Sequence, residues 1–481
     1  MKKIFVSIFL ILGIFIGILF WNYAKFDSLQ LEKSEKVNEL VLSDSVAHLL
    51  AEAIRYKTIS YDDTSKIDYA AFLLFHKFLK EKFPITFQKL EVEIVHQYSL
   101  LLTLKGKDLS LAPIVLMGHQ DVVPFEDVTR YKWLHDPFSG TIENGIIYGR
   151  GAIDDKINVI GVLCAIEAML QKNMQPTRTI LLAFGHDEEI GGEQGAKKIA
   201  EILAERKIQP AFVLDEGGII TEEKVPGLEH QPVALIGTAE KGYLTLELSV
   251  SIPGGHSSMP ESVTSIHVLS KAIDKLVNSP FEARFSIPQL LFIRHLGPEM
   301  PFVNKLAMAN LWLTKPLVLK QFSASAVGNA GVRTTIAPTI FHAGIKENVV
   351  PTNATAIINF RLLPNDSPDK VIQYVSEAIH DTLIKIQPIG KMLEASTPSP
   401  DSGWAYHVLT TTIKTVFGES LTSPYLCIGG TDAKHFEKIC KNVYRFTPMT
   451  DPIGFHGLNE QLRVDDFKKA VYFYYNLLKE M

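Results

Sequence analysis

The sequence predicts an α/β catalytic domain with a mostly parallel sheet, into which a smaller α+β (ferredoxin-like) lid domain is inserted. Two observations carry this prediction. Short apolar runs such as APIVLMG, TRTILLAFG and PAFVLD alternate with helix-like segments, as strands covered on both faces do. After Gly237, GYLTLELSVS instead alternates apolar and polar residues, as a half-exposed strand in a different layer would.

Length and composition limit the class of protein. The chain has 481 residues, 46% hydrophobic and 21% charged, which is enough for two compact domains and a terminal segment. With a formal net charge of −5 and no long basic run, the expected partner is a small molecule and not a nucleic acid. Cys164, Cys427 and Cys440 form neither a CxxC pair nor an even disulfide set, so we interpret them as packing residues.

The N-terminus, residues 1–25, predicts a membrane anchor. Residues 4–21 carry no ionisable group and follow Lys2 and Lys3, and Trp21 and Tyr23 suit a membrane interface. No A-x-A-like cleavage site is visible, so an uncleaved anchor is favoured over a long signal peptide and secretion. The positive-inside bias then places the catalytic domains outside the cytoplasm, after a partly helical linker at 26–44.

The domain order follows from the segment patterns. Residues 45–238 are expected to form the first part of the catalytic domain, 239–395 the lid, and 396–481 the returning part that completes the α/β sheet. In the lid we expect the order strand, helix, strand, strand, helix. A long apolar insertion at about 281–334 is interpreted as extra lid core or a homodimer contact.

Acids and a histidine follow three of the predicted strands. IVLMG runs into His119 and Asp121, ILLAFG into Glu188 and Glu189, and FVLD ends on Asp215. Because the carboxyl ends of strands in an open α/β sheet form the ligand crevice, we expect these side chains to converge. Singly, an H-x-D motif is weak and an acid pair is more often a solvated loop, so the convergence carries the prediction.

These residue types suit paired divalent metal ions. Zn²⁺ takes imidazole nitrogen and carboxylate oxygen, and two such ions share a bridging carboxylate. Asp154, in YGRGAIDDK, is the candidate bridge, although an aspartate before a helix is also a common N-cap. His456, in the glycine-flanked GFHGLNE, is the best remaining histidine. Adjacent acids such as Glu188 and Glu189 repel each other unless a cation lies nearby, so one could bind metal while the other moves a proton.

Eight separate motifs together resemble one known family. GHQDVVP, DPFSGTIENGIIYGRGAIDDK, GHDEEIGG, LDEGG, GGHSSMP, NVVPTNATAIINFRLLP, GGTDAK and HGLNE are similar, in order and spacing, to the two-zinc metallopeptidases that include carboxypeptidase S, glutamate carboxypeptidase, aminoacylase and succinyl-diaminopimelate desuccinylase. The resemblance covers nearly everything after residue 45. The branch it most resembles contains carboxypeptidase S and secreted enzymes that act on N-fatty-acyl amino acids, which adds an acyl-chain trough as an alternative role for the 281–334 insertion.

The resemblance implies two Zn²⁺ ions per subunit, with the following ligands: His119, Asp154, Glu189, Asp215 and His456. By that resemblance, Asp154 bridges the ions, His119 and Asp215 complete one site, and Glu189 and His456 complete the other. It also implies that Asp121 orients His119. Glu188 is the implied general base that deprotonates the attacking water and then protonates the leaving amine.

The resemblance extends to the lid. It implies that His256 reaches the site on lid closure and stabilises the oxyanion, and that Arg361 clamps the substrate carboxylate. Asn348 and Thr431 are weaker candidates for the same pocket. The expected activity is hydrolysis of an amide or peptide bond next to a free carboxylate, with the reverse condensation also available. The alternatives are an aminopeptidase, against which Arg361 argues, and an inactive binding protein of the same fold.

Overall fold

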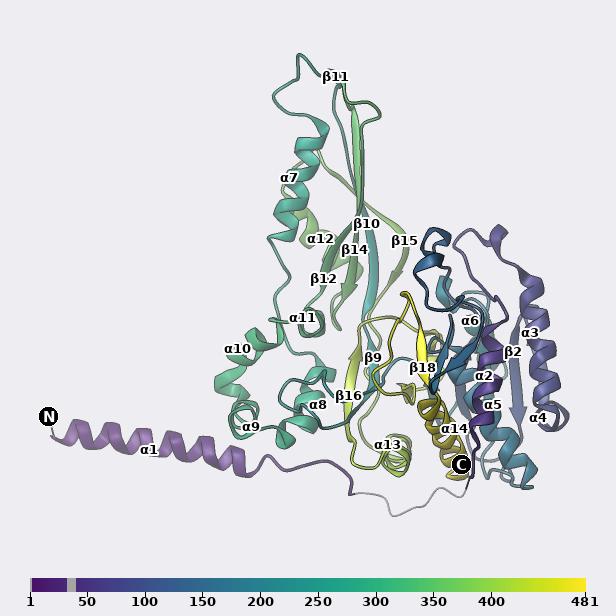
Figure 1. Ribbon diagram of the computed structural model, residues 1–481. Helices are drawn as coiled ribbons and strands as arrows, with labels where there is room; N and C mark the ends of the chain where they lie inside the picture. Colours follow the sequence, from purple (N-terminus) through teal and green to yellow (C-terminus); the bar gives the residue numbers. More distant parts are fainter. Residues whose placement is uncertain (1, 33–39) are drawn as a thin grey trace.

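A nine-stranded sheet forms the centre of the catalytic domain (Figure 1). The structure is a computed structural model that describes residues 2–32 and 40–481. The sheet comprises β1 (Glu91–Val95), β2 (Ser99–Leu104), β3 (Ile114–His119), β6 (Ile180–Gly185), β7 (Phe212–Asp215), β8 (Ile220–Thr221), β9 (Val233–Glu240), β16 (Leu421–Cys427) and β17 (Val443–Arg445). Its order is β1-β2-β6-β3-β7-β17-β9-β16, with β8 on β9. The central strands β6, β3, β7 and β17 are parallel, which confirms the predicted α/β class.

Helices cover both faces of this sheet. One face packs against α2 (Ala47–Ile54), α3 (Tyr69–Lys82), α4 (Pro84–Lys89), α5 (Lys156–Gln171), α13 (Trp404–Phe417) and α14 (Val464–Lys479). The other packs against α6 (Ala196–Glu205) and the 3₁₀ turn η6 (Asp432–Phe436). In β3, Ile114 and Leu116 join the first core, whereas Val115 and Met117 join the second. The strands are therefore apolar throughout, because neither face meets water.

The lid is an antiparallel sheet with two helices on one face. Its elements are β10 (Gly242–Ser251), α7 (Ser265–Val277), β12 (Thr335–Ala343), β14 (Asn353–Leu362), α12 (Pro368–Ile379) and β15 (Lys385–Leu393). The order β12-β14-β10-β15 is the ferredoxin-like arrangement that the sequence predicted. We did not predict β15, because KIQPIGKML forms an exposed edge strand and lacks the alternation of a half-buried one. At the tip, β11 (Gly255–His256) pairs with β13 (Val349–Val350).

The chain crosses between the two domains at two points. It enters the lid at Lys241, between β9 and β10, and returns between β15 and α13. The crossings touch, since the backbone N–H of Ser396 donates to the carbonyl of Glu240. The buried ammonium of Lys241 donates to the carbonyls of Ala330 and Arg333, each at 2.8 Å. The crossing at Lys241 is thus joined to the end of the insertion.

Of the insertion at 281–334, Phe281 joins the lid core, but its helices do not, which corrects the first of the two roles that we expected, extra lid core or a homodimer contact. The insertion forms α8 (Ile287–Leu296), α9 (Phe302–Ala309), α10 (Leu311–Phe322) and α11 (Ala326–Val332), joined in part by the 3₁₀ turn η5 (Gly297–Glu299). Ile293 and Leu296 of α8 pack with Val233 of β9 and Leu421 of β16, at the edge of the catalytic sheet. The apolar residues of the insertion cover this sheet edge, which the sequence alone could not assign to them.

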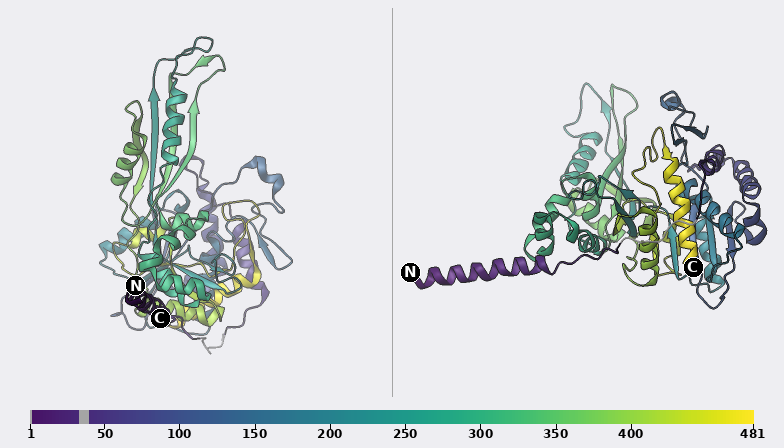
Figure 2. Two further views of the ribbon diagram at one scale, coloured as in Figure 1. Left: turned by 90° about the vertical axis from the view of Figure 1, so that its left-hand side faces the viewer. Right: turned by 60° about the horizontal axis from the view of Figure 1, so that its bottom comes forward.

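The N-terminal segment is a single straight helix, α1 (Lys2–Ala24), whose N-terminal part projects away from the domains (Figure 2). Within Lys3–Ala24, an 18-residue window has a mean hydropathy of 2.8, and the stretch is long enough to cross a bilayer; within the described residues no other helix meets that test. Residues 26–32 have no regular secondary structure, and residues 33–39 of the linker that we expected to be partly helical lie outside the described part of the chain. Phe26 packs against the α8–α9 core, so the start of the linker is docked.

Candidate metal centre

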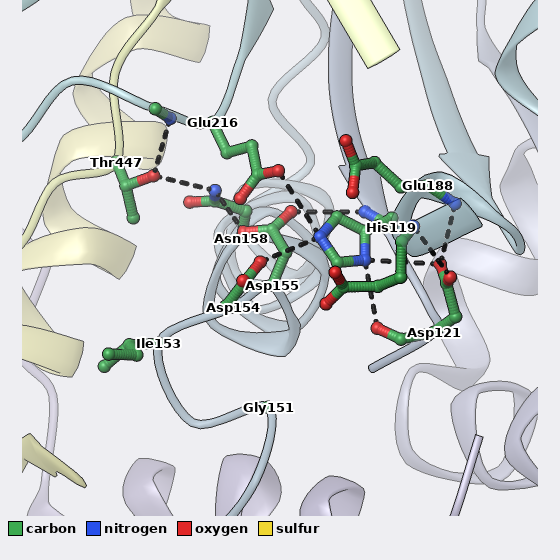
Figure 3. A network of polar contacts seen from close by, with 12 residues as sticks. His119, Asp121, Gly151, Ile153, Asp154, Asp155, Asn158, Glu188, Glu216 and Thr447 are labelled. Atoms are coloured by element: carbon green, nitrogen blue, oxygen red, sulfur yellow. Dashed lines mark hydrogen bonds and ion pairs between the residues drawn. The ribbon is translucent and has the colours of Figure 1, made fainter. Parts of the chain in front are cut away.

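The carboxyl ends of three neighbouring parallel strands bring together several of the predicted residues, and Figure 3 shows His119, Asp121 and Glu188 among them. His119 is the last residue of β3, and β6 is followed by the 3₁₀ turn η4 (Glu188–Ile190). Asp215 ends β7, and Glu216 follows it. Because β6, β3 and β7 are adjacent and parallel, these ends meet at one edge of the sheet, as the sequence predicted.

Asp154 lies between two histidines that are far apart in the sequence. Its Oδ1 is 2.9 Å from Nε2 of His119, and its Oδ2 is 2.7 Å from Nε2 of His456. The N-cap position of α5 belongs to Asp155, whose side chain makes no capping hydrogen bond. The capping alternative for Asp154 is therefore wrong, and both of its oxygens face imidazole nitrogens, as expected for a bridging carboxylate.

Two groups of three possible ligands share Asp154. The first consists of His119, Asp154 and Glu216, and the second of Asp154, Glu189 and His456; within each group the ligand atoms lie within 4.8 Å of one another. Glu216 Oε1 is 3.4 Å from His119 Nε2, and Glu189 Oε2 is 3.4 Å from His456 Nε2. Two sites with one common carboxylate match the donor pattern of a paired metal centre.

Glu216, and not Asp215, completes the first group. Asp215 Oδ2 accepts the backbone N–H of Ala433 in η6 at 2.7 Å, on the opposite face of the sheet. Successive side chains of a strand point to opposite faces, so Asp215 follows Val213 toward η6 and Glu216 follows Leu214 toward α5. That alternation within FVLDE was the signal that could have identified Glu216.

Asp121 links a ligand to the acidic turn. Nδ1 of His119 is 3.0 Å from the backbone oxygen of Asp121 and 3.3 Å from its Oδ1. The same carboxylate accepts the backbone N–H groups of Glu188 and Glu189, each at 3.1 Å. Asp121 thus contacts the His119 ring through both its backbone and its side chain, and its carboxylate also holds the turn that carries both glutamates.

The electrostatics of the cluster favour a bound cation. Burial, followed by the neighbouring charge of Asp154, raises the pKa of Glu189 to about 7. Burial likewise raises the pKa of Glu188 and of Glu216 well above the usual range. The buried Oε1 of Glu189 has no hydrogen-bond partner. Closely packed buried carboxylates are unfavourable without compensating positive charge, and their N and O donors are those that Zn²⁺ accepts.

Arg150 and Glu460 support the centre, and we did not predict either. Arg150 Nη1 donates to Glu460 Oε2 at 2.7 Å, and both side chains are buried. Glu460 Oε1 accepts the backbone N–H groups of Gly151 and Ile153, each at 2.9 Å. The loop before Asp154 is therefore tied to the loop after His456. The short strands β5 (Ile146–Tyr148) and β18 (Gln461–Arg463) pair beside this link, with β4 (Thr141–Glu143) completing a small sheet.

The lid residues do not join the cluster in this structure. His256 and Asn348 lie together at the exposed tip, where the Ser257 N–H donates to the Asn348 carbonyl, and β11 is remote from the catalytic sheet (Figure 1). Arg361 lies on β14 opposite the second residue of β10, with its guanidinium 4.7 Å from the Tyr243 ring centroid.

Thr431 is nearer to the centre than the lid residues. Its hydroxyl donates to Glu240 Oε1 at 2.6 Å, and it caps η6, the turn whose Ala433 N–H contacts Asp215. Arg445, which is fully buried, donates to the same Glu240 oxygen at 2.6 Å. Thr431 therefore lies between the domain crossing at Glu240 and the sheet edge that carries the ligands.

The parallel sheet, the inserted lid and the paired ligand groups define the class of α/β metallohydrolases. The chain matches the Peptidase family M20/M25/M40 over residues 115–480 and belongs to that family. It is 39% identical over 449 residues to probable carboxypeptidase S-like 2 of Dictyostelium discoideum, covering 91% of this chain and 85% of the relative. It is 37% identical over 444 residues to the N-fatty-acyl-amino acid synthase/hydrolase PM20D1 of Mus musculus, covering 90% and 87%.

Solved structures show the same fold at low sequence identity. The M20 family metallo-carboxypeptidase Sso-CP2 of Sulfolobus solfataricus superposes with a TM-score of 0.67 at 21% identity, over 91% of this chain and 99% of the other. Human carnosine dipeptidase 1 gives 0.65 at 15% identity, over 91% and 96%. These findings confirm the resemblance on which the expected family and branch rested.

Proposed function

We propose that this chain is a two-zinc hydrolase that cleaves an amide or peptide bond next to a free carboxylate, releasing an amino acid from an N-acyl amino acid or a small peptide. The observation that carries the proposal is that Asp154 is shared between two groups of three candidate ligands. The names of the relatives, a carboxypeptidase and a synthase/hydrolase of N-fatty-acyl amino acids, support this substrate class and include the reverse condensation.

The proposed ligands are Glu216, His119, Asp154, Glu189 and His456. When bound, the two ions polarise the scissile carbonyl and acidify water. Glu188 belongs to neither ligand group, and its N–H is held by Asp121, so its carboxylate is available to take a proton from the attacking water. The same carboxyl then donates that proton to the leaving amine.

Arg361 is the proposed clamp for the substrate carboxylate. A guanidinium binds a carboxylate with two parallel hydrogen bonds, and its stacking on Tyr243 restricts its orientation. Thr431 lies close enough to the ligand edge to line the same pocket. For His256 to stabilise the oxyanion, with Asn348 beside it, the lid tip must approach the metal centre, which is the closure that the sequence predicted.

The lid also offers a surface for the expected homodimer. β12 is an edge strand of the lid sheet, and its Ile340 and Phe341 side chains are exposed. An exposed edge strand with apolar side chains is a template for pairing with another chain. Light scattering of the purified protein, with Ile340→Lys as the disrupting variant, tests this part of the proposal.

The proposed location is a membrane anchored by α1, with the catalytic domain outside the cytoplasm. The hydropathy and exposure of α1 support this placement. The alternative is secretion after removal of the segment as a signal peptide. Intact mass of the mature protein distinguishes the two, because cleavage removes the whole of α1.

The activity is tested with the zinc-loaded full chain in detergent and a panel of dipeptides, short N-acyl and long N-acyl amino acids, followed by mass spectrometry. We expect loss of the N-acyl substrates or of carboxyl-terminal residues, and turnover lowered at least about 100-fold in Glu188→Gln with both metal ions retained. Cleavage only of substrates with a free amine would identify an aminopeptidase. Consumption of no substrate class would identify a binding protein.

A matched variant tests the carboxylate clamp. Arg361→Ala should raise KM for substrates with a free carboxylate and leave cleavage of the corresponding carboxamides unchanged, because only the carboxylate loses a charged partner. An equal effect on both substrate forms would show that Arg361 acts through the fold of the lid instead.

A further inference from the structure

Helices α9 and α10 of the insertion lie against the C-terminal part of α1. The ring centroids of Phe15 and Trp312 are 5.9 Å apart, and those of Tyr23 and Phe302 are 5.2 Å apart. The Nδ2 group of Asn310, between α9 and α10, donates to a backbone carbonyl of α1 at 3.1 Å. A part of the soluble domain therefore runs beside the helix that is proposed to enter the membrane (Figure 2).

The same two helices expose large apolar side chains to solvent. Their exposed fractions are Phe302 51%, Val303 71%, Trp312 60%, Leu313 45% and Leu317 63%. We call these five residues the insertion patch. Such a group of neighbouring exposed apolar residues marks an interaction surface, because scattered single exposures are normal but clusters are not.

The charged residues of α9 and α10 themselves have one sign. No aspartate or glutamate occurs between Glu299 and Glu347, whereas α9 and α10 carry Lys305, Lys315 and Lys320. Helices that carry apolar side chains and lysines but no acids have the composition of helices that lie in a membrane interface and contact anionic headgroups. If two copies of the chain met through this patch in a symmetric dimer, the lysines of one copy would lie near the lysines of the other without a counter-charge. The charge therefore favours a membrane over a second copy as the partner of the patch.

The depth of the contact also fits a bilayer. Trp21 marks the interfacial end of the apolar part of α1, and Phe15 lies six residues before it. At 1.5 Å per residue, the Phe15 contact with Trp312 is roughly 9 Å below that level. Interfacial helices bury their apolar faces about 5–10 Å into the boundary between headgroups and acyl chains.

We propose that the insertion patch docks on the same lipid bilayer that α1 enters, with its lysines against anionic headgroups. The proposal rests on the proposed role of α1 as an anchor. Because α8 packs on β16 and Gln30 binds the carbonyl of His295 and the backbone of Thr422, the insertion and the start of the linker are fixed to the catalytic sheet. Docking would hold the catalytic domain in one orientation next to the membrane surface.

The test uses full-length chains that each carry one introduced cysteine labelled with an environment-sensitive fluorophore. The native cysteines are all buried, so labelling is selective. Val303→Cys and Leu313→Cys report on the patch, Leu12→Cys reports on α1, and Leu74→Cys on exposed α3, at the opposite side of the molecule from α1, is the control (Figure 1). The proteins are reconstituted in phosphatidylcholine–phosphatidylserine vesicles with and without doxyl-labelled lipid.

We expect blue-shifted emission and doxyl quenching at 303, 313 and 12, and neither at 74. Quenching at 12 with solvent-like emission at 303 and 313 would overturn the docking proposal and leave the anchor in place. Blue-shifted emission at 303 and 313 that doxyl lipids do not quench would show that protein, such as a second copy, covers the patch, and would also overturn it. No quenching at position 12 would remove the anchor and the docking proposal together.

Discussion

The carboxylate of Asp121 accepts the backbone N–H of Glu188 at 3.1 Å. The same side chain lies 3.3 Å from Nδ1 of His119. One buried aspartate therefore sets the position of the proposed general base and the orientation of a proposed metal ligand. Mutation of partners of this kind typically costs about 10–100-fold in metal affinity or activity.

Replacing Asp121 should separate positioning from binding of substrate. In Asp121→Asn, the side chain loses its charge, and an NH2 group replaces one of the two oxygens that accept backbone N–H groups of the turn. We therefore expect kcat to fall about 10–100-fold with little change in KM. Steady-state kinetics with parallel metal analysis measure this. Asp136→Asn, at a side chain 45% exposed, is the control and should behave as wild type. Wild-type kcat in Asp121→Asn would contradict the positioning role.

The ligand in the first group can be identified by a pair of neighbouring substitutions. Glu216→Gln should lose about half of the bound zinc, because one of two ions loses a charged ligand. Asp215→Asn should retain both ions, because its carboxylate contacts a backbone N–H and lies in neither ligand group, and an amide oxygen can still accept that hydrogen bond. Elemental analysis after dialysis gives the metal content. Zinc loss in Asp215→Asn together with full zinc content in Glu216→Gln would identify Asp215 as the ligand instead.

Breaking the Arg150–Glu460 pair should reduce both stability and the order of the centre. In Glu460→Gln, Arg150 stays buried without its charged partner, and removing one member of a buried pair costs about 3 kcal/mol or more. We expect a lower urea midpoint and weaker zinc binding at the site that includes His456. Glu81→Gln, in an ion pair that is mostly exposed, should change the midpoint very little. Equal effects of the two substitutions would contradict the structural role of Glu460.

His435 should contribute to acid sensitivity. Burial, followed by the charge of Lys434, lowers its pKa from 6.5 to about 4, and its neutral ring contacts the carbonyl of Gly191 at 3.2 Å. Because the unfolded chain binds this proton more readily, the contribution is present above pH 6.5 and is lost as the pH falls toward 4. A shift of this size corresponds to about 3 kcal/mol at most.

Urea unfolding at pH 7 and pH 5 measures that contribution. We expect His435→Gln to lose less stability than wild type between the two pH values, because glutamine does not titrate there. His267→Gln, at an exposed lid histidine, is the matched control and should follow wild type. The contribution is absent if His435→Gln and wild type lose the same amount.

The sequence predicted the central elements of the catalytic domain well because the strands of this domain are apolar on both faces and are followed by histidine and acidic residues. It failed where a choice depended on the direction of a side chain. Asp215 and Glu216 are adjacent residues that both carry a carboxylate, and the two side chains point to opposite faces of the sheet. We did not predict β15 because an exposed edge strand needs no alternation of apolar and polar residues.

The sequence by itself determined the domain classes, the family, and the residue types that end the central strands, since these follow from local periodicity and from motifs in a fixed order. Only the tertiary structure decided which acid joins His119, that the Arg150–Glu460 pair ties two distant loops together, and that the insertion lies beside α1 instead of in the lid. Each of these depends on contacts between segments far apart in the chain, and burial of an apolar face does not specify which partner buries it.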